Sequence, residues 1–491
     1  MERPNVLFIL SDQMKATATS LYGNRESPTP NLEALAGRGV RFDQAHTPCP
    51  LCVPARVSMM TGQYPHNHGS RRNETLLEPG REHAFRIWQE AGYTTGLIGK
   101  NHCFDATERD RCFDVWCEIG HYGIQSGAET IGMEWWRDPA GVREAHSGRR
   151  EMPWQTKNIS YAVTDYPLED YSTGLIAGQT ERFLEEQGSD PFALWVSFPD
   201  PHTPWEVPRA YAEQQEFSEI TLPPWNSSEF DLAAPERNRL LHEILGVEND
   251  PPEEVRSVIG VYYGMIRFID DAVGRIMASL DRLGLRENTI VVFASDHGDL
   301  MGEHMMVNKG GLFYDALTRV PLLFSWPRRL PEGVTGDGMA NLIDIVPTLL
   351  SLQGIEIPKT MDGTPLATVA GGEPQDALFC EYGAGGPPFT MEDLLTLEHT
   401  SGDAALMSSL QPREAEGRRK MVRTREWKYV HDPMGDLDEL YDLRSDPWEL
   451  SNVAALPENR GRICELSRRV MDWSIRTEDA RPVPLPGEAY V

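Results

Sequence analysis

Five short apolar runs alternate with stretches of helical periodicity, and this alternation constrains the fold more than any other feature of the chain. The runs are nearly unbroken, as strands buried on both faces are, and they cover residues 5–10, 94–99, 192–198, 289–295 and 320–326. Between them, apolar residues recur at helical steps from Val255 to Leu283, and residues 30–39 begin with proline and end with glycine, as helices often do. We therefore predict an α/β fold with a large mixed, mostly parallel central sheet that is flanked by helices.

The pattern changes after about residue 370. Residues 376–383, 420–433 and 437–443 resemble short strands joined by turns, and residues 460–476 have the apolar spacing of an amphipathic helix. We predict two units: a larger N-terminal domain of residues 1–372, and a smaller C-terminal α+β subdomain of residues 373–491 that contains a short antiparallel sheet.

The composition excludes several classes of protein. Of the 491 residues, 40% are hydrophobic and 25% are charged, which is ordinary for a soluble protein. The formal net charge of -29 argues against binding to nucleic acid or to anionic membranes, because phosphate binding requires clustered Lys and Arg. No apolar run approaches the roughly 20 residues of a membrane helix, and the run from Val6 to Leu10 is too short for a signal sequence. We expect a cytoplasmic protein whose seven cysteines are reduced thiols.

Two of the predicted strands are followed at once by residues that bind metals. Asp12 and Gln13 come after the first strand, and Asp296 and His297 come after the strand of residues 289–295. In α/β sheets, ligands sit at the carboxyl ends of the strands, and oxygen and imidazole donors together suit a divalent cation. Each pair alone is also typical of an ordinary turn. Their joint placement favours one metal site.

Four further side chains could give the same sheet edge a positive character. Lys100 and His102 follow the strand of residues 94–99, His202 follows the strand of residues 192–198, and Lys309 lies in the segment NKGGLFYDALTRVP. Singly, each is as well explained as a solvated lysine or as a histidine that caps or braces a loop. Together they suit an anionic oxyester.

The cysteines of CPLC, Cys49 and Cys52, are spaced like half of a zinc clip. No second pair of ligands at zinc spacing follows in the sequence, so a structural zinc is not expected there. A thiolate nucleophile with a histidine as its base is the alternative. The spacing alone does not decide between that role and a buried thiol.

The sequence CVPAR (52–56), followed by VSMMTG, resembles the CxPxR signature of the type I, formylglycine-dependent sulfatases of the alkaline phosphatase superfamily. Ala55 departs from the commonest form, CxPSR, whereas Cys52 and Arg56 match. Further matches run along the chain, among them LFILSDQ, TPNLEALAGRGVRF, GLIGKNH, ASDHGDLMGEH and WKYVHDPMGDLDELYDLRSDPWELSNV. The resemblance implies an N-terminal catalytic domain with the fold predicted above.

The resemblance also implies a modification and a metal. Cys52 would be oxidised after translation to formylglycine (3-oxoalanine) by a formylglycine-generating enzyme. One divalent cation would be bound by Asp12, Gln13, Asp296, His297 and the modified Cys52. Gln13 and His297 are similar to the ligands of choline-sulfatase-like and phosphonate-monoester-hydrolase-like members. An oxygen-rich site favours calcium, and the imidazole ligand makes manganese the alternative.

The implied mechanism gives each remaining candidate a role. One hydroxyl of hydrated formylglycine attacks sulfur while Arg56 holds the nucleophile. Lys100 and Lys309 offset charge on the sulfate oxygens, and His202, together with Lys309, protonates the departing alcohol. A base such as His102 then lets the remaining hydroxyl collapse to the aldehyde and expel sulfate.

We expect a sulfuric ester hydrolase that cleaves a sulfate monoester of a small metabolite or a short saccharide. The alternative within the superfamily is a phosphonate monoester or phosphodiester hydrolase. Lys100 and His102 in GLIGKNH resemble the sulfate pocket of sulfatases and favour the first hypothesis. A catalytically silent metal-binding or scaffold protein is the hypothesis from another class, because a fold does not fix a function.

Specificity is the least determined property. Asn73, beside Arg71 and Arg72, is a candidate for contact with the leaving group, or else these residues form a solvated loop. Residues 383–405 are long and irregular enough for a lid. The expected partners are a small sulfated substrate and the enzyme that makes formylglycine, with no nucleic acid and no membrane. Assembly into a homo-oligomer stays open.

Overall fold

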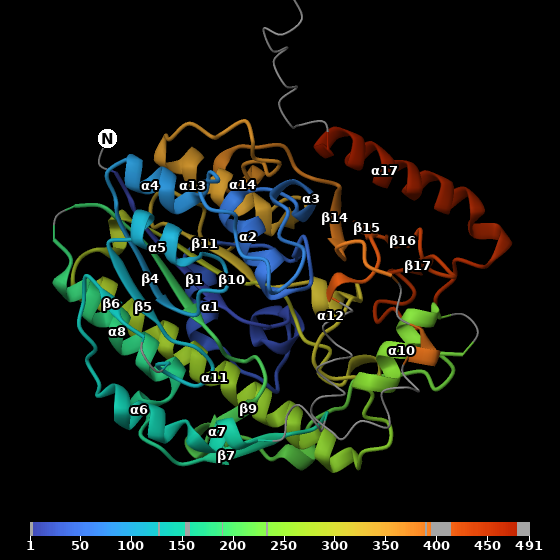
Figure 1. Ribbon diagram of the computed structural model, residues 1–491, viewed down its shortest axis with the longest axis horizontal. Coiled ribbons are helices and arrows are strands. Elements are labelled where there is room, and N and C mark those ends of the chain that lie inside the picture. The colour runs from blue at the N-terminus through green and yellow to red at the C-terminus, as the bar shows by residue number, and fades with distance from the viewer. Residues whose placement is uncertain are drawn as a thin grey trace, which may run out of the picture.

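Nine strands form one central sheet in the computed structural model, which describes residues 3–125, 128–152, 158–188, 190–231, 234–387, 390–393 and 414–478 (Figure 1). Across the sheet the order is β12 (Val334–Thr335), β2 (Val40–Arg41), β11 (Leu322–Ser325), β10 (Thr289–Ser295), β1 (Asn5–Ser11), β8 (Phe192–Phe198), β4 (Thr94–Gly99), β5 (Val115–Glu118) and β6 (Thr130–Ile131). The strands from β10 to β5 run parallel. β11 is antiparallel to β10, and β6 is antiparallel to β5. The predicted mixed, mostly parallel sheet is confirmed.

Helices cover both faces of this sheet because its central strands are apolar on both faces. In β1, Leu7 and Ile9 pack on one side with α1 (Pro30–Gly37), α8 (Ser172–Glu186) and α11 (Pro252–Arg282). Phe8 and Leu10 pack on the other side with α2 (Cys52–Thr61), α4 (Ala84–Glu90) and α13 (Ile345–Gln353). This alternation is the pattern that a strand with side chains pointing to opposite faces requires. It explains why the middle of each central strand is apolar, with polar residues such as Asn5, Ser11 and Ser295 at the strand ends.

A second, four-stranded sheet is antiparallel and lies beside helix α17 (Arg460–Glu478) (Figure 1). It is built from β14 (Ala377–Tyr382), β15 (Arg419–Thr424), β16 (Trp427–His431) and β17 (Glu439–Asp442), and α17 packs on it through Val470 and Trp473. The small antiparallel sheet is therefore confirmed. The domain limits at residues 372 and 373 stay a prediction, and most of the predicted lid, residues 388–389 and 394–405, lies outside the described residues.

Besides the two sheets, the structure contains short strand pairs and short helices. Two small pairs of parallel strands are β3 (Ala45–His46) with β13 (Ala340–Asn341), and β7 (Tyr161–Thr164) with β9 (Trp205–Pro208). The shorter helices are α3 (Pro65–His68), α5 (Ala106–Cys112), α6 (Pro139–Ala145), α7 (Ser147–Glu151), α9 (Arg209–Ala212), α10 (Glu236–Leu245), α12 (Asp315–Thr318) and α14 (Ala367–Ala370). Among the described residues, no helix combines the length and the apolar character that crossing a bilayer requires.

A network of ion pairs joins the small sheet to α12 at Asp315, the first residue of that helix. Arg423 Nη2 lies 2.8 Å from Asp315 Oδ2, and Lys428 Nζ lies 2.7 Å from Asp315 Oδ1. Lys428 Nζ also donates to the carbonyl oxygen of Phe313 at 2.7 Å. Although burial alone would raise it, these two cations hold the pKa of Asp315 well below its usual range. The segment before α12 is thus fixed by side chains of β15 and β16.

A second joint connects β14 to α3 through Glu381. Its Oε1 accepts hydrogen bonds from His66 N at 2.6 Å and from His66 Nδ1 at 3.0 Å. His66 Nε2 in turn lies 2.9 Å from Thr477 Oγ1 in α17. Burial alone would raise the pKa of Glu381, but these bonds and the nearby positive charges lower it from 4.5 to about 2. The carboxylate is therefore stabilised in its ionised form in the folded protein.

This joint predicts a loss of stability in acid. A group whose pKa is lower in the folded than in the unfolded chain stabilises the fold above the unfolded pKa, and this contribution disappears as the pH falls toward the folded pKa. For Glu381 we expect the free energy of unfolding to fall by about 2 kcal/mol between about pH 5 and about pH 3. Urea unfolding of the protein and of Glu381→Gln across this range measures the effect. The variant should show a smaller slope, whereas Glu356→Gln, at an exposed position, should keep the original one. Equal slopes for Glu381→Gln and the unchanged protein contradict the prediction.

Candidate active site

The candidate site lies at the carboxyl ends of the parallel strands. Ser11, the last residue of β1, pairs in register with Ser295, the last residue of β10, so Asp12 and Asp296 emerge side by side. Gln13 follows with a left-handed backbone, φ 66°, a conformation that is costly for a residue with a side chain and that clusters at functional sites. The parallel register thus brings together residues that lie far apart in the sequence.

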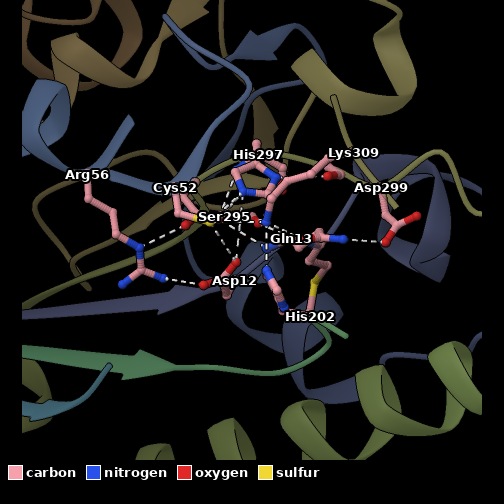
Figure 2. A network of polar contacts seen from close by, with 12 residues as sticks. Asp12, Gln13, Cys52, Arg56, His202, Ser295, His297, Asp299 and Lys309 are labelled. Atoms are coloured by element: carbon pink, nitrogen blue, oxygen red, sulfur yellow. Dashed lines mark hydrogen bonds and ion pairs between the residues drawn. The ribbon is translucent and has the colours of Figure 1, made fainter. Parts of the chain in front are cut away.

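Cys52 begins α2 and faces this edge. Its Sγ lies 3.1 Å from His297 Nε2 and 3.7 Å from Asp12 Oδ1 (Figure 2). Ligand atoms of Asp12, Cys52, Asp296 and His297 all lie within 4.8 Å of one another, and the four residues are buried. His297 Nδ1 lies 2.9 Å from the carbonyl oxygen of Gly298, which leaves Nε2 free to face the centre, as in histidines that bind metals.

Gln13 completes the donor set. Its Nε2 donates to Asp299 Oδ2 at 2.5 Å and to Asn308 Oδ1 at 3.1 Å. These two acceptors orient the amide so that its Oε1 faces the centre, where it accepts from Lys309 Nζ at 2.7 Å (Figure 2). Two carboxylates, an amide oxygen and an imidazole fit a divalent cation. The choice of calcium, with manganese as the alternative, stays a prediction.

Arg56 holds the two carboxylates in place. Its Nε donates to Asp296 Oδ2 at 2.8 Å and its Nη2 donates to Asp12 Oδ2 at 3.0 Å. Its Nη1 donates to Ser197 Oγ at 2.9 Å and to the carbonyl oxygen of Lys100 at 3.0 Å. Burial alone would raise the pKa of Asp12, but Lys100, His202 and Arg56 hold it well below its ordinary value. Asp12 is therefore an anion ready to bind a cation.

The two cysteines of CPLC have opposite environments. Burial and Asp12 oppose ionisation of the Cys52 thiol, yet Lys309 and His297 outweigh them and lower its pKa. Cys49 packs in an apolar cluster with Phe313 and Cys380, and burial raises its pKa well above the ordinary value. Only Cys52 belongs to the polar centre. All seven cysteines lie within the described residues, and none forms a disulfide.

Cationic and imidazole groups surround the thiol. Lys309 Nζ lies 3.2 Å from Cys52 Sγ and 2.6 Å from His202 Nε2 (Figure 2). Lys100 Nζ forms an ion pair with Asp12 and lies 2.9 Å from His121 Nε2. The rings of His121 and His202 are 4.5 Å apart between centroids. Three of the four predicted groups, Lys100, His202 and Lys309, thus belong to one connected network.

The surroundings of His102 and Asn73 differ from those of the three residues in this network. His102 is exposed and has φ 47°. Asn73 Oδ1 accepts from the backbone N–H of Val53 at 3.1 Å, and its Nδ2 donates to Glu414 Oε1 at 2.9 Å. Asn73 therefore fixes the first turn of α2, next to Cys52. Contact of Asn73 with a substrate, and the role of His102 as a base, stay predictions.

Several residues of the site were not predicted from the sequence. Asp299 and Asn308 orient Gln13, Ser197 binds Arg56, and His121 contacts Lys100. His121 follows β5, a strand too short to be recognised from its apolar pattern. Ser197 lies within β8, where a serine looks like an ordinary strand residue. Asp299 and Asn308 stand close to predicted residues in the sequence, and that proximity was the available signal.

The donor set thus faces a cysteine at the start of a helix, on a mixed sheet that lies between helices. The sequence profile of the sulfatase family matches residues 4–355, and the chain belongs to the sulfatase family. It is 27% identical to an arylsulfatase of Clostridium perfringens over 94% of this chain and 92% of the relative. It is 29% identical to a choline-sulfatase of Rhizobium meliloti over 97% of this chain and 88% of the relative. A phosphonate monoester hydrolase of Agrobacterium radiobacter has the same fold, with a TM-score of 0.78, 26% identity and coverage of 97% of this chain and 96% of the other.

Proposed function

We propose that this sulfatase-family hydrolase cleaves a sulfate monoester of a small metabolite or short saccharide at Cys52, converted to formylglycine. The observation that carries the proposal is the placement of Cys52 Sγ, 3.1 Å from His297 Nε2 and 3.2 Å from Lys309 Nζ, beside the Asp12 carboxylate. Sulfatases typically use a metal and formylglycine. When bound, the metal supplies positive charge and lowers the pKa of a nearby hydroxyl group, and the hydrated aldehyde supplies that hydroxyl.

The side chains of the site would act by position and charge. Arg56 keeps the carboxylates of Asp12 and Asp296 fixed. Lys100 and Lys309 offer ammonium groups to the oxygens of a tetrahedral anion, which gains charge in the transition state. His202 Nε2 lies 2.6 Å from Lys309 Nζ, and His202 would pass a proton to the leaving alcohol.

His102, exposed after β4, has the access to water that a base for the second step needs.

The acidic composition, with a net charge of -29, disfavours a long polyanion as the substrate. It supports a small anionic substrate that binds in a locally positive pocket. A formylglycine-generating enzyme would be the maturation partner.

A phosphonate monoester or phosphodiester hydrolase is the second candidate, because the chain resembles a phosphonate monoester hydrolase over nearly its whole length. Lys100 supports the sulfate monoester. Its ammonium group reaches Asp12 in the centre, and the segment GLIGKNH that carries it resembles the sulfate pocket of sulfatases. Both esters are tetrahedral, so we expect the enzyme to hydrolyse both classes, at different rates.

Lys100→Thr tests this proposal. We expect kcat/KM for a sulfate monoester to fall by about 10²- to 10³-fold, because a charged donor to the transition state is lost, and we expect a smaller fall for a phosphonate monoester. Steady-state kinetics with sulfate monoesters, phosphonate monoesters and phosphodiesters measures both. Lys359→Thr, at an exposed position, is the control and should leave all rates unchanged. A phosphonate preferred tenfold or more by the unchanged enzyme, about 1.4 kcal/mol of transition-state binding, would reverse the assignment.

A further inference from the structure

A second group of potential metal ligands lies outside the active site, between α4 and α5. It consists of His83, the residue before α4, and of Glu108 and Cys112, which stand one turn apart on α5. We call it the His83–Glu108–Cys112 cluster. All three side chains have 0% exposure. The cluster therefore combines an imidazole, a carboxylate and a thiol, the three donor types that zinc binds, in a place closed to solvent.

The distances within the cluster match the edges of a small tetrahedron. His83 Nε2 lies 3.1 Å from Glu108 Oε2, and Cys112 Sγ lies 3.4 Å from the same oxygen. The three ligand atoms all lie within 4.8 Å of one another. Zinc–ligand bonds of about 2.0 to 2.3 Å at tetrahedral angles place neighbouring ligand atoms about 3.3 to 3.6 Å apart. Small side-chain movements would bring the three atoms onto one ion.

The surroundings hold the carboxylate in the required orientation. Glu108 Oε1 accepts from the backbone N–H of Gly80 at 2.6 Å, which leaves Oε2 to face His83 and Cys112. Asp105 caps α5 by accepting from Glu108 N at 2.9 Å, and the His83 ring packs 4.8 Å from that of Phe104. Supporting contacts of this kind orient the ligands of known metal sites.

The charges of the cluster balance once a divalent cation is bound. Burial and Glu108 raise the pKa of the Cys112 thiol to about 12, so a bound cation has to displace the proton of this thiol. In the described part of the chain, His83 is the one ion-pair partner recorded for Glu108. A divalent cation, one carboxylate, one thiolate and one neutral imidazole sum to zero, which removes an uncompensated charge from the interior.

We propose that His83 Nε2, Glu108 Oε2 and Cys112 Sγ bind a zinc ion that ties α4 to α5, separately from the catalytic centre. Binding releases one proton, from the Cys112 thiol, while the imidazole proton moves from Nε2 to Nδ1. His83 Nδ1 is buried and has no hydrogen-bond partner in the described structure, so it lacks a protein partner both before the proton moves and after it. A water would fill the fourth position, as in zinc sites with three protein ligands.

Cobalt titration of the full-length Cys52→Ala protein, stripped of metal, tests the proposal. The substitution removes the thiol of the catalytic centre, so any thiolate-to-cobalt charge-transfer absorption comes from another cysteine. We expect one equivalent of cobalt to produce this absorption, zinc to abolish it, and X-ray absorption to show one sulfur and one imidazole at the cobalt.

Two further variants locate the site. Cys52→Ala/Cys112→Ala should lose the absorption, whereas Cys52→Ala/Cys103→Ala should keep it, because Cys103 is a buried thiol of the same apolar core that is not in the cluster. If the Cys112 variant does not fold, Glu108→Gln in the Cys52→Ala background provides the test: zinc should raise the Tm of the Cys52→Ala protein and have a weaker effect on the Glu108 variant. No charge-transfer absorption in Cys52→Ala, or the same absorption without Cys112, overturns the proposal and leaves a hydrogen-bonded core cluster.

Discussion

Cys52→Ser is expected to lower kcat/KM for a sulfate monoester by at least about 10³-fold, even though serine fills nearly the same space. The formylglycine route ends when a hydroxyl on the same carbon collapses to an aldehyde and expels sulfate, and serine has no second hydroxyl for that step. Attack by serine would leave the sulfate on the enzyme. The protein should be produced in a host that has the converting enzyme, and the rates should be compared with those of the unchanged protein.

Cys49 is an internal control for the modification of Cys52, because both cysteines lie in one peptide. The tryptic peptide of residues 42–56 contains both Cys49 and Cys52. Mass spectrometry should show the loss of one sulfur and two hydrogens and the gain of one oxygen at Cys52 alone, because Cys49 lies in an apolar cluster. Cys49→Ser should retain activity. An unmodified Cys52 in an active enzyme, or full activity of Cys52→Ser, would rule out the formylglycine mechanism.

Arg56→Met is the substitution with the second largest expected effect, and it should act on stability and on catalysis together. Arg56 is fully buried and bridges Asp12 and Asp296. Its removal leaves two buried carboxylates without their shared cation, which costs about 3 to 5 kcal/mol in the free energy of unfolding. We also expect kcat/KM of the folded protein to fall by at least about 10²-fold, because the carboxylates would no longer be held in place. Urea unfolding and steady-state kinetics measure the two effects.

Arg286→Met is the matched control for this variant. Arg286 is also buried, but its guanidinium donates to neutral groups, the carbonyl oxygen of Thr289 at 3.3 Å and Ser325 Oγ at 2.5 Å. It should lose less stability and keep its kcat/KM. Calcium or manganese should restore part of the stability of Arg56→Met and none of that of Arg286→Met, because a bound cation would replace charge only between the two carboxylates. Equal losses and equal responses to metal would contradict the role given to Arg56.

The fold could be predicted from the sequence where local patterns decide it. The buried strands carry unbroken apolar runs, and the 31-residue helix α11 repeats its apolar residues at helical steps, so both were visible without a structure. The direction of β11 was not visible, because an apolar strand has the same pattern whether it runs parallel or antiparallel to β10. The edge strands β12 and β6 and the second strand, β2, are each two residues long and therefore shorter than any periodic signal.

The site was partly predictable for a related reason. Strand-end positions identified Asp12, Asp296 and Lys100, because parallel strands deliver their ends to one edge. The contacts among them depend on chain segments hundreds of residues apart, as in the hydrogen bond from Gln13 to Asp299, |i−j| = 286. His121 and Ser197 carry no local signal of function, and only the folded chain shows that they touch Lys100 and Arg56.

The Asp315 network gives the reaction centre a mechanical link to the small sheet. Lys309 and Asp315 belong to one short segment of the chain. Asp315, at the end of that segment, forms ion pairs with Arg423 of β15 and Lys428 of β16. We therefore expect binding of an anion at Lys309 to be coupled to order in these two strands, and such coupling acts equally in both directions. An anion bound in the centre should slow amide hydrogen exchange in β15 and β16, and a ligand that loosens the small sheet should weaken anion binding at Lys309.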